Sequence, residues 1–326
     1  MQTRTLGKSG FKVSEIGLGC WQLGGDFGPL NDEKAHDILA AADQSGITFW
    51  DTADVYGGGV SEQRIAAYLH REANHIIVAS KVGKGGGLFP NDYEKQSVRA
   101  CVEQSARRLN VDTIDLVQLH CVPPEVLKAG DILAWMEDFQ DQGLIRAFGA
   151  SVETLDEALF AARHPRLTSL QIIFNLFRQN AISELFPLAE ANEVGIIVRL
   201  PLASGVLSGT MSADRQFAKS DHRHYNRHGE HFSVGETFSG VPMETAVGFV
   251  ETMKAWLPNG MSMAEMAIRW ILDYPAVSTV IAGATRPDQV IQNAAVSGIP
   301  PLSATVHDKL AVMYKEEIEP VIQVPI

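Results

Sequence analysis

Four residues of types that can move protons follow short apolar runs within the first 120 positions. Asp51 closes the run at 47–50, and Tyr56 comes five residues after it. Lys81 follows the run at 76–80, and His120 follows the run at 114–119. Such runs predict buried strands, and the carboxyl ends of parallel strands in a βα array meet on one face. We therefore expect these four side chains to lie together.

This set of side chains suits a proton-coupled hydride transfer. Reduction of a carbonyl needs hydride at carbon and a proton donor within hydrogen-bond reach of the oxygen. Free tyrosine has a pKa of about 10, and a neighbouring ammonium lowers that pKa because it favours the phenolate. We predict Tyr56 as the acid and Lys81 as the group that lowers its pKa. Asp51 would hold Lys81 charged, and His120 would orient the substrate.

A plainer interpretation of the same residues is an ordinary buried ion pair, Asp51–Lys81, beside a packed tyrosine and a hydrogen-bonded histidine. Buried ion pairs perturb pKa values in many proteins without any catalytic role. For any one of these residues alone, the plainer interpretation would be preferred. Their placement at three consecutive strand ends favours an active site.

The elements that would position these residues alternate along the whole chain. Apolar runs without clean alternation indicate parallel strands buried on both faces, and the segments between them carry apolar residues at helical spacing. Predicted strands cover residues 16–20, 47–50, 76–80, 114–119, 145–150, 170–174, 196–200 and 277–282. Predicted helices cover residues 31–44, 61–69, 94–109, 125–142, 153–163, 182–194, 262–272, 287–296 and 305–317.

Eight strands that alternate with helices without a break favour a closed (β/α)8 TIM barrel over a doubly wound sheet. A β-hairpin over residues 3–15 precedes the first of these strands. Residues 204–244 are predicted to form a long loop at the carboxyl face of the barrel, either a functional flap or a partly disordered segment. We see no linker and predict one domain across residues 1–326.

Composition and charge narrow the classes of partner. The 326 residues are 45% hydrophobic and 20% charged, which allows a large core. With 27 Lys and Arg against 39 Asp and Glu, the net charge is −12, which argues against nucleic acid or an anionic membrane as partner. Without a membrane-length apolar run or a secretory signal, and with three scattered cysteines, the chain is expected to be cytoplasmic.

The run Asp51-Thr52-Ala53-Asp54-Val55-Tyr56-Gly57, with Ser61-Glu62 after it, resembles the signature of the aldo-keto reductase superfamily. The resemblance implies a (β/α)8 barrel, an NADP(H) cofactor bound without a Rossmann domain, and the catalytic roles given above for Asp51, Tyr56, Lys81 and His120. It extends over nearly the whole chain, through Lys81, His120 and the runs at 17–21, 149–151, 171–175, 201–209 and 283–286.

The resemblance also implies a set of cofactor contacts. Asp51 would touch the nicotinamide ribose, and Ser151 and Gln171 would bind the carboxamide. Arg286, beside a predicted helix start, is the candidate for the adenosine 2′-phosphate, since helix N-termini and guanidinium groups both bind phosphate. Alternatively, Arg286 is an exposed surface arginine that does not contact the cofactor. The full predicted set is Gly19, Cys20, Trp21, Asp51, Ser151, Gln171, Arg199, Leu202, Ser204, Gly205, Leu207, Gly283, Thr285, Arg286, Gln289 and Asn293.

Two positions depart from the common pattern of that superfamily. Val152 follows Ser151 where many members carry asparagine, which implies the loss of one carboxamide contact. Arg199 stands where an aromatic residue commonly stacks on the nicotinamide. A guanidinium plane can stack as well, but its positive charge would favour the neutral, reduced ring over the cationic, oxidised one. The hypothesis that follows is a preference for NADPH-driven reduction.

A histidine-rich run at 221–231 could suggest a metal site. It lacks a helical spacing of histidines with a third fixed ligand, and it lies in the predicted long loop. We therefore predict a substrate-binding flap there and no metal. Arg223 and Arg227, in the same run, could bind an acidic substrate or be solvated.

The leading functional prediction is an NADPH-dependent aldo-keto reductase that reduces a small aldehyde or ketone with Tyr56 as general acid. One alternative is an NAD(P)-dependent sugar or polyol dehydrogenase that works in the oxidative direction. Another is a cofactor-binding regulatory subunit of the kind that attaches to ion channels. The substrate pocket is expected between the loops at 21–29, 121–125 and 208–240.

Overall fold

In the computed structural model, which describes residues 1–25, 27–71 and 75–325, eight parallel strands close into a barrel. Neighbours in sequence pair throughout, and the last strand pairs with the first. The predicted (β/α)8 barrel is confirmed, and the doubly wound alternative is wrong. The strands are β3 (Ile16–Gly19), β4 (Phe49–Asp51), β5 (Ile77–Val82), β6 (Ile114–His120), β7 (Ile145–Ser151), β8 (Ser169–Ile173), β9 (Gly195–Arg199) and β10 (Val277–Gly283).

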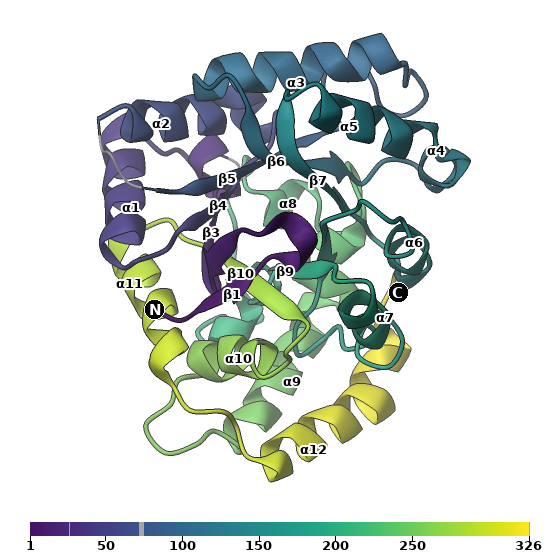
Figure 1. Cartoon of the computed structure of the whole chain (residues 1–326). Coiled ribbons are helices and arrows are strands. Elements are labelled where there is room, and N and C mark those ends of the chain that lie inside the picture. Colours follow the sequence, from purple (N-terminus) through teal and green to yellow (C-terminus); the bar gives the residue numbers. More distant parts are fainter. Residues whose placement is uncertain (26, 72–74, 326) are drawn as a thin grey trace.

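Helices surround the barrel on its outside, as Figure 1 shows. The helices are α1 (Asp32–Gln44), α2 (Val60–Leu69), α3 (Lys95–Leu109), α4 (Pro124–Ala129), α5 (Asp131–Asp141), α6 (Leu155–Ala161), α7 (Leu185–Ala191), α8 (His222–Tyr225), α9 (Met243–Lys254), α10 (Met263–Leu272), α11 (Pro287–Ala295) and α12 (Ala304–Met313). Two of these helices begin with a capping box, α6 with Thr154 and Glu157 and α10 with Ser262 and Glu265.

The barrel interior holds a small apolar core of its own, apart from the large core between strands and helices. Because strand side chains alternate between faces, the residue two positions after each interior side chain also points inward. Phe49, Ala79, Leu116 and Ile197 belong to the interior core. The same faces therefore place Asp51, Lys81, Gln118 and Arg199 one layer nearer the carboxyl mouth.

The N-terminal hairpin, β1 (Thr3–Thr5) with β2 (Lys12–Ser14), crosses the amino end of the barrel (Figure 1). Its residues Leu6, Phe11 and Val13 close the interior core from below. Arg4 joins the hairpin to the end of α10 and the start of β10, because it donates to the carbonyls of Leu272 at 2.6 Å and Val277 at 2.7 Å. The predicted hairpin is thus confirmed, and it closes the end of the barrel opposite the site.

Several predicted helix boundaries are wrong. The helix expected over 125–142 is two helices, α4 and α5, because Gly130 takes a left-handed conformation with φ 86°. The helix expected over 305–317 changes to a π-helical turn at Tyr314–Ile318. The helix expected over 182–194 is regular only over α7. Helix α9 was not predicted at all, although Met243, Ala246, Val250 and Met253 on its buried face have helical spacing.

The segment between β9 and α9, residues 200–242, is called the β9–α9 loop below. It contains 3-10 turns at Ala203–Ser208, Val234–Glu236 and Phe238–Gly240, besides α8. Asn175 fastens it, because its side-chain amide donates to the Leu200 carbonyl and to Ser239 Oγ, both at 2.8 Å. In the parts of the chain described, no helix has the length and apolar character needed to cross a bilayer. One domain across residues 1–326 stays a prediction.

Candidate active site

The four proton-moving residues meet at the carboxyl mouth of the barrel. Lys81 Nζ lies 2.5 Å from Asp51 Oδ2, 2.9 Å from the Thr52 carbonyl oxygen and 3.2 Å from Tyr56 Oη. The side chains of Lys81 and Asp51 are only 1% and 2% exposed. The ring of His120 stands edge-on to that of Tyr56, with 6.0 Å between centroids. The juxtaposition expected from the sequence is present.

Two glutamines complete the surroundings of Asp51. Gln118 and Gln171 each donate a side-chain N–H to Asp51 Oδ1, at 3.0 and 2.7 Å. The carboxylate therefore accepts from Lys81 on one oxygen and from two amides on the other. Breaking a buried pair of this kind costs about 3–5 kcal/mol, because one charge is left without a partner. Gln118 was not predicted as a site residue, although it lies two residues before His120 on the same face of β6.

The loop after β4 fixes Tyr56. Gly57 follows it in a left-handed conformation with φ 59°, and a Cβ there would lie 2.4 Å from the Gly24 carbonyl oxygen. Below the loop, the Thr52 hydroxyl donates to Ser61 Oγ at 2.8 Å, and Ser61 donates to the Cys20 carbonyl at 2.9 Å. Ser61 in the signature thus joins the Tyr56 loop to the end of β3.

The structure corrects the expected direction of the Tyr56 pKa. Burial raises this pKa well above its usual value, and the charges of Asp51 and Glu236 raise it further while Arg199 opposes them. The sequence predicts that the Lys81 ammonium lowers this pKa while Asp51 keeps the ammonium charged, and the predicted direction is wrong. Asp51 lies closer to that ammonium than the phenol does and offsets its charge, so burial decides the direction. The phenol is therefore held neutral, with its proton available for donation.

His120 is neutral in these surroundings. Burial holds its pKa well below the usual range, and the positive charges of Lys84, Lys81 and Arg199 act in the same direction. Among the residues described, its Nδ1 has no hydrogen-bond partner. A neutral imidazole has one N–H that donates and one nitrogen that accepts. His120 can therefore orient a polar group at the mouth without carrying charge.

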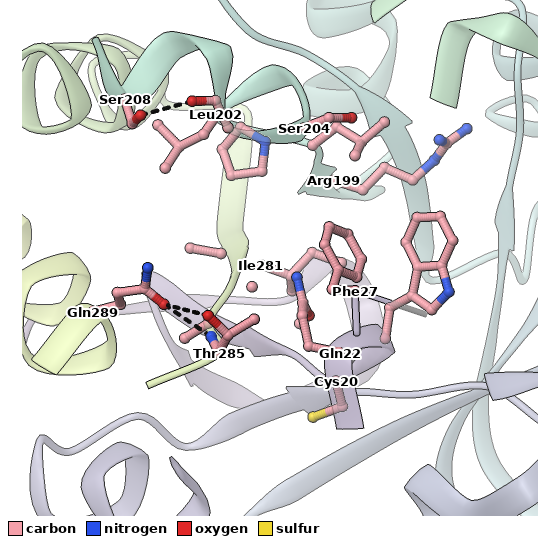
Figure 2. A pocket seen from close by; sticks show the side chains of 18 of the residues that line it. Cys20, Gln22, Phe27, Arg199, Leu202, Ser204, Ser208, Ile281, Thr285 and Gln289 are labelled. Atoms are coloured by element: carbon pink, nitrogen blue, oxygen red, sulfur yellow. Dashed lines mark hydrogen bonds between the residues drawn. The ribbon is translucent and has the colours of Figure 1, made fainter. Parts of the chain in front are cut away.

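A cavity of about 340 Å³ extends from this mouth. Asp51, Tyr56 and Arg199 lie among its lining residues, as do Thr285 and Gln289 before and within α11. Figure 2 shows Arg199 towards one end of this cavity and Thr285 and Gln289 towards the other. The cavity thus connects the proton-donating group to a helix N-terminus.

Comparison with known proteins decides the family. A model of the aldo/keto reductase family matches residues 15–315. This chain belongs to the aldo-keto reductase family. Over 308 residues it is 31% identical to the aldo-keto reductase YhdN of Bacillus subtilis (strain 168), with 91% of this chain and 89% of that protein covered. It is 29% identical to a probable voltage-gated potassium channel subunit beta of Oryza sativa subsp. japonica, with 95% of each covered.

Two solved structures are similar at a TM-score of 0.75. The holo form of the aldo-keto reductase AKR11C1 from Bacillus halodurans is 28% identical, with 96% of each chain covered. The glycerol dehydrogenase AKR11B4 from Gluconobacter oxydans is 27% identical, with 99% of this chain and 97% of that chain covered. As an aldo-keto reductase, the protein is an NAD(P)(H)-dependent oxidoreductase that acts on carbonyl or alcohol groups.

Most of the cofactor residues expected of this aldo-keto reductase line the cavity. Three do not: Ser151 is buried at the end of β7, Leu207 is fully buried in the outer core, and Asn293 lies in the buried face of α11. The expected residues in the lining are Gly19, Cys20, Trp21, Asp51, Gln171, Arg199, Leu202, Ser204, Gly205, Gly283, Thr285, Arg286 and Gln289.

Arg199, predicted to stack its guanidinium on the nicotinamide, has protein partners for that group. Its Nη1 forms an ion pair with Glu236 Oε1, and its Nη2 donates to the Val152 carbonyl at 2.9 Å. Glu236 comes from the β9–α9 loop and also lines the cavity. The predicted tilt towards the reduced cofactor assumed an uncompensated positive charge, and that assumption is wrong.

Arg286 is exposed and forms a two-point ion pair with Asp288, at 2.9 and 3.0 Å. It precedes Pro287, the first residue of α11, so it lies where a phosphate would meet the helix N-terminus. Asp288 brings a competing carboxylate to the same place. The surface-arginine alternative and the phosphate-binding prediction for Arg286 therefore both stay open.

The cavity lining includes further residues from the loops predicted to form the substrate pocket. Glu236, Gln22 and Met211 line the cavity and lie in the loops at 21–29 and 208–240 where the substrate pocket is predicted, although none of the three was singled out as a site residue. Arg223 lines it too, where it pairs with Asp221 at 2.6 Å and lies over the ring of Phe217. Arg227 pairs with Glu244 instead, and it is absent from the lining among the residues described. Residue 26, inside the loop predicted at 21–29, lies outside the described residues.

Within the histidine-rich run, His222 is fully buried and packs against aromatic rings. Its ring centroid lies 4.8 Å from that of Trp21 and 4.5 Å from that of Phe27. These contacts join α8 to the loop after β3, across the mouth of the barrel. His222 thus serves packing of the β9–α9 loop, which agrees with the predicted flap position.

Proposed function

We propose that this aldo-keto reductase uses NADPH to reduce a small aldehyde or ketone, with Tyr56 as the proton donor. The observation that carries the proposal is the continuous contact from Asp51 through Lys81 to the Tyr56 hydroxyl in the wall of a cavity. A donor must be protonated and within reach of the substrate oxygen. The raised pKa of Tyr56 keeps it protonated at neutral pH.

The cavity fits a dinucleotide on two grounds. Its lining joins the Asp51–Tyr56 region to the start of α11, as an extended ligand requires. At the far end, Thr285, Arg286 and Gln289 offer donors at a helix N-terminus, which suits a phosphate. The nicotinamide would supply hydride to the carbonyl carbon. Residues Gln171 and Arg199 would hold the nicotinamide end, and Leu202, Ser204 and Gly205 the pyrophosphate.

The chain's own residues divide the remaining work. Tyr56 donates its proton to the oxygen that gains charge, because a developing alkoxide is a stronger base than the buried phenolate. Lys81 then stabilises the phenolate at 3.2 Å, and Asp51 keeps Lys81 charged throughout. Neutral His120 donates an N–H to the same oxygen and fixes its position. General acid catalysis of this kind contributes about 10²–10⁴-fold to rate.

A carbonyl panel tests this function. The protein is incubated with NADPH or NADH and a set of small aldehydes and ketones, and consumption of the reduced cofactor is followed by absorbance. We expect turnover of at least one carbonyl, with NADPH preferred. A protein that binds NADPH but consumes it with none of them would contradict the reductase function.

A polyol or sugar dehydrogenase acting in the oxidative direction is the second candidate, favoured by the likeness to a glycerol dehydrogenase. Oxidation would need Tyr56 as a base, so its raised pKa disfavours that direction at neutral pH. Assays with NADP+ or NAD+ and polyols separate the two. Oxidation that exceeds reduction at pH 7 would favour the dehydrogenase.

A regulatory subunit is the third candidate, because one relative is a probable potassium channel subunit beta. The complete set of Asp51, Tyr56, Lys81 and His120 favours an enzyme. Pull-down from membrane fractions tests this candidate, and stable association with a channel protein would support it. We also propose a cytoplasmic location, since Cys20, Cys101 and Cys121 are all free thiols.

A further inference from the structure

Arg199 and Glu236 form an ion pair in the lining of the cavity that Asp51 and Tyr56 also line. The pair is largely desolvated, with 9% of the Arg199 side chain and 13% of the Glu236 side chain exposed. The Val152 carbonyl holds the second guanidinium nitrogen at 2.9 Å. The third, Nε, is buried and has no hydrogen-bond partner among the described residues. Arg199 is thus fixed in place by groups other than a cofactor.

The electrostatic effect of this pair reaches the reacting groups. Glu236 raises the Tyr56 pKa and Arg199 lowers it, so both charges act on the same phenol. Charges in a site of low dielectric interact strongly over a few ångströms. The nicotinamide ring is cationic when oxidised and neutral when reduced. A single net charge at this position would therefore make the protein bind one redox form of the cofactor more tightly than the other.

We propose that Glu236 is the residue that sets the balance between oxidised and reduced cofactor, by cancelling the charge of Arg199. This inference rests on the proposed function, since it takes the nicotinamide to bind at this end of the cavity. With Glu236 present, the field of Arg199 is reduced to that of a closely spaced pair. Without it, the guanidinium alone would repel the oxidised ring.

The other cations at the mouth are matched by carboxylates in the same way. Lys81 is paired with Asp51 at 2.5 Å, and Lys84 lies 4.0 Å from Glu153. A carboxylate oxygen of Glu153 also lies within 4.8 Å of a carboxylate oxygen of Glu236. Glu236 also raises the pKa of Lys84, and more than Glu153 does, so its carboxylate acts on two cations. The loss of Glu236 therefore removes one negative charge beside the nicotinamide end.

The β9–α9 loop holds Glu236 in this position. Ser204 Oγ donates to the Glu236 carbonyl at 3.1 Å and accepts from the Phe238 N–H at 3.3 Å. Ser204 is itself a proposed pyrophosphate contact in the cavity lining. The loop that would cover the pyrophosphate therefore also delivers the carboxylate to Arg199, so cofactor binding and charge balance share one element.

Binding measurements on three variants test the proposal. Dissociation constants for NADP+ and NADPH are measured by titration calorimetry for wild type, E236Q, R199M and R199M/E236Q. In E236Q the ratio of Kd for NADP+ to Kd for NADPH should rise about tenfold or more, which equals about 1.4 kcal/mol. In R199M the ratio should fall, and by less, because an isolated buried carboxylate takes up a proton. In the double variant this ratio should lie within about threefold of the wild-type ratio.

Glu244→Gln is the matched control, since Glu244 is 65% exposed and pairs with Arg227 away from the cavity. Its ratio should equal that of wild type. An unchanged ratio in E236Q, with NADP+ and NADPH both bound, overturns the inference. If thermal unfolding shows that E236Q does not fold, Glu236→Ala takes its place, and an unchanged ratio there also overturns the inference. Failure of wild type to bind either form would instead refute the proposed function.

Discussion

Tyr56 and His120 are both neutral at physiological pH in this structure, and burial is the first cause in each case. The phenol retains its proton, and the imidazole retains one donor and one acceptor. Their neutrality matters because the site already holds the charges of Lys81, Asp51 and Arg199. Donation from Tyr56 leaves a phenolate, and the Lys81 ammonium at 3.2 Å stabilises that one new charge.

The first prediction concerns the pH dependence of reduction. The His120 pKa is lowered, so protonation begins below about pH 6.5, its ordinary value, and the Tyr56 pKa is raised above about 10. At saturating NADPH, kcat should therefore be flat from about pH 6.5 to 9. Initial rates across that interval check this. A limb that titrates near pH 7–8 would show that one of the two groups is charged in the working enzyme.

The second prediction concerns cofactor choice at Arg286. Its guanidinium is shared with Asp288, and both are exposed, so solvent weakens the pair. Arg286→Ala should raise the Kd for NADPH about tenfold and leave that for NADH nearly unchanged, because only NADPH carries the 2′-phosphate. Asp288→Asn should lower the Kd for NADPH, since the competing carboxylate is gone. Equal effects on both cofactors would exclude Arg286 as the 2′-phosphate contact.

At the scale of elements, the loop after β4 carries Tyr56 and depends on glycine. Gly57 and Gly58 both have left-handed backbone, with φ 59° and 63°. Only at Gly57 would a Cβ meet backbone, at 2.4 Å from the Gly24 oxygen, whereas nothing lies within 4 Å of the same position at Gly58. The close approach of residues 24 and 57 thus sets where the phenol lies.

The third prediction uses this matched pair of glycines. Gly57→Ala should destabilise the protein by about 2–4 kcal/mol and lower kcat, because the loop must move away from residue 24. Gly58→Ala should cost only the left-handed strain, about 1–2 kcal/mol, with kcat nearly kept. Urea unfolding and initial rates measure both. Equal losses of kcat in the two variants would show that the close approach does not position Tyr56.

The elements predictable from sequence were those with a strong local pattern. Buried strands appear in the sequence as apolar runs. Asp51, Lys81 and His120 could be predicted to lie together because they follow such runs and parallel strands bring their carboxyl ends to one face. The split at Gly130 was missed because the apolar residues of α4 and α5 read as one continuous helix. Glu236 could not be predicted, since nothing in the local sequence pairs a loop carboxylate with Arg199, 37 positions earlier.

At the scale of the molecule, the two ends of the barrel do different work. The carboxyl end carries the site, and the amino end is closed by the hairpin through Leu6, Phe11 and Val13. Arg4 joins the hairpin to the rest, with a further bond to Glu15 at 3.0 Å. This separation explains how the mouth can carry paired charges while the interior beneath it stays apolar.

The fourth prediction follows from that separation. Arg4→Met should lower the free energy of unfolding by about 2–4 kcal/mol, because Glu15 and several carbonyls lose their donor. Its kcat and its Kd for NADPH should equal those of wild type, since the hairpin lies at the opposite end of the barrel. Calorimetry and steady-state kinetics check the two parts. A fall in kcat at a temperature where the variant is fully folded would contradict the separation.

The most direct test of the central claim is Tyr56→Phe, which removes one hydroxyl and keeps the ring. Calorimetry should give a Kd for NADPH within about twofold of wild type, while kcat for carbonyl reduction falls by about 10²–10⁴-fold, the usual contribution of a general acid. The observation behind this expectation is the 3.2 Å contact between the Tyr56 hydroxyl and Lys81. Turnover in Tyr56→Phe at the rate of wild type would contradict the account.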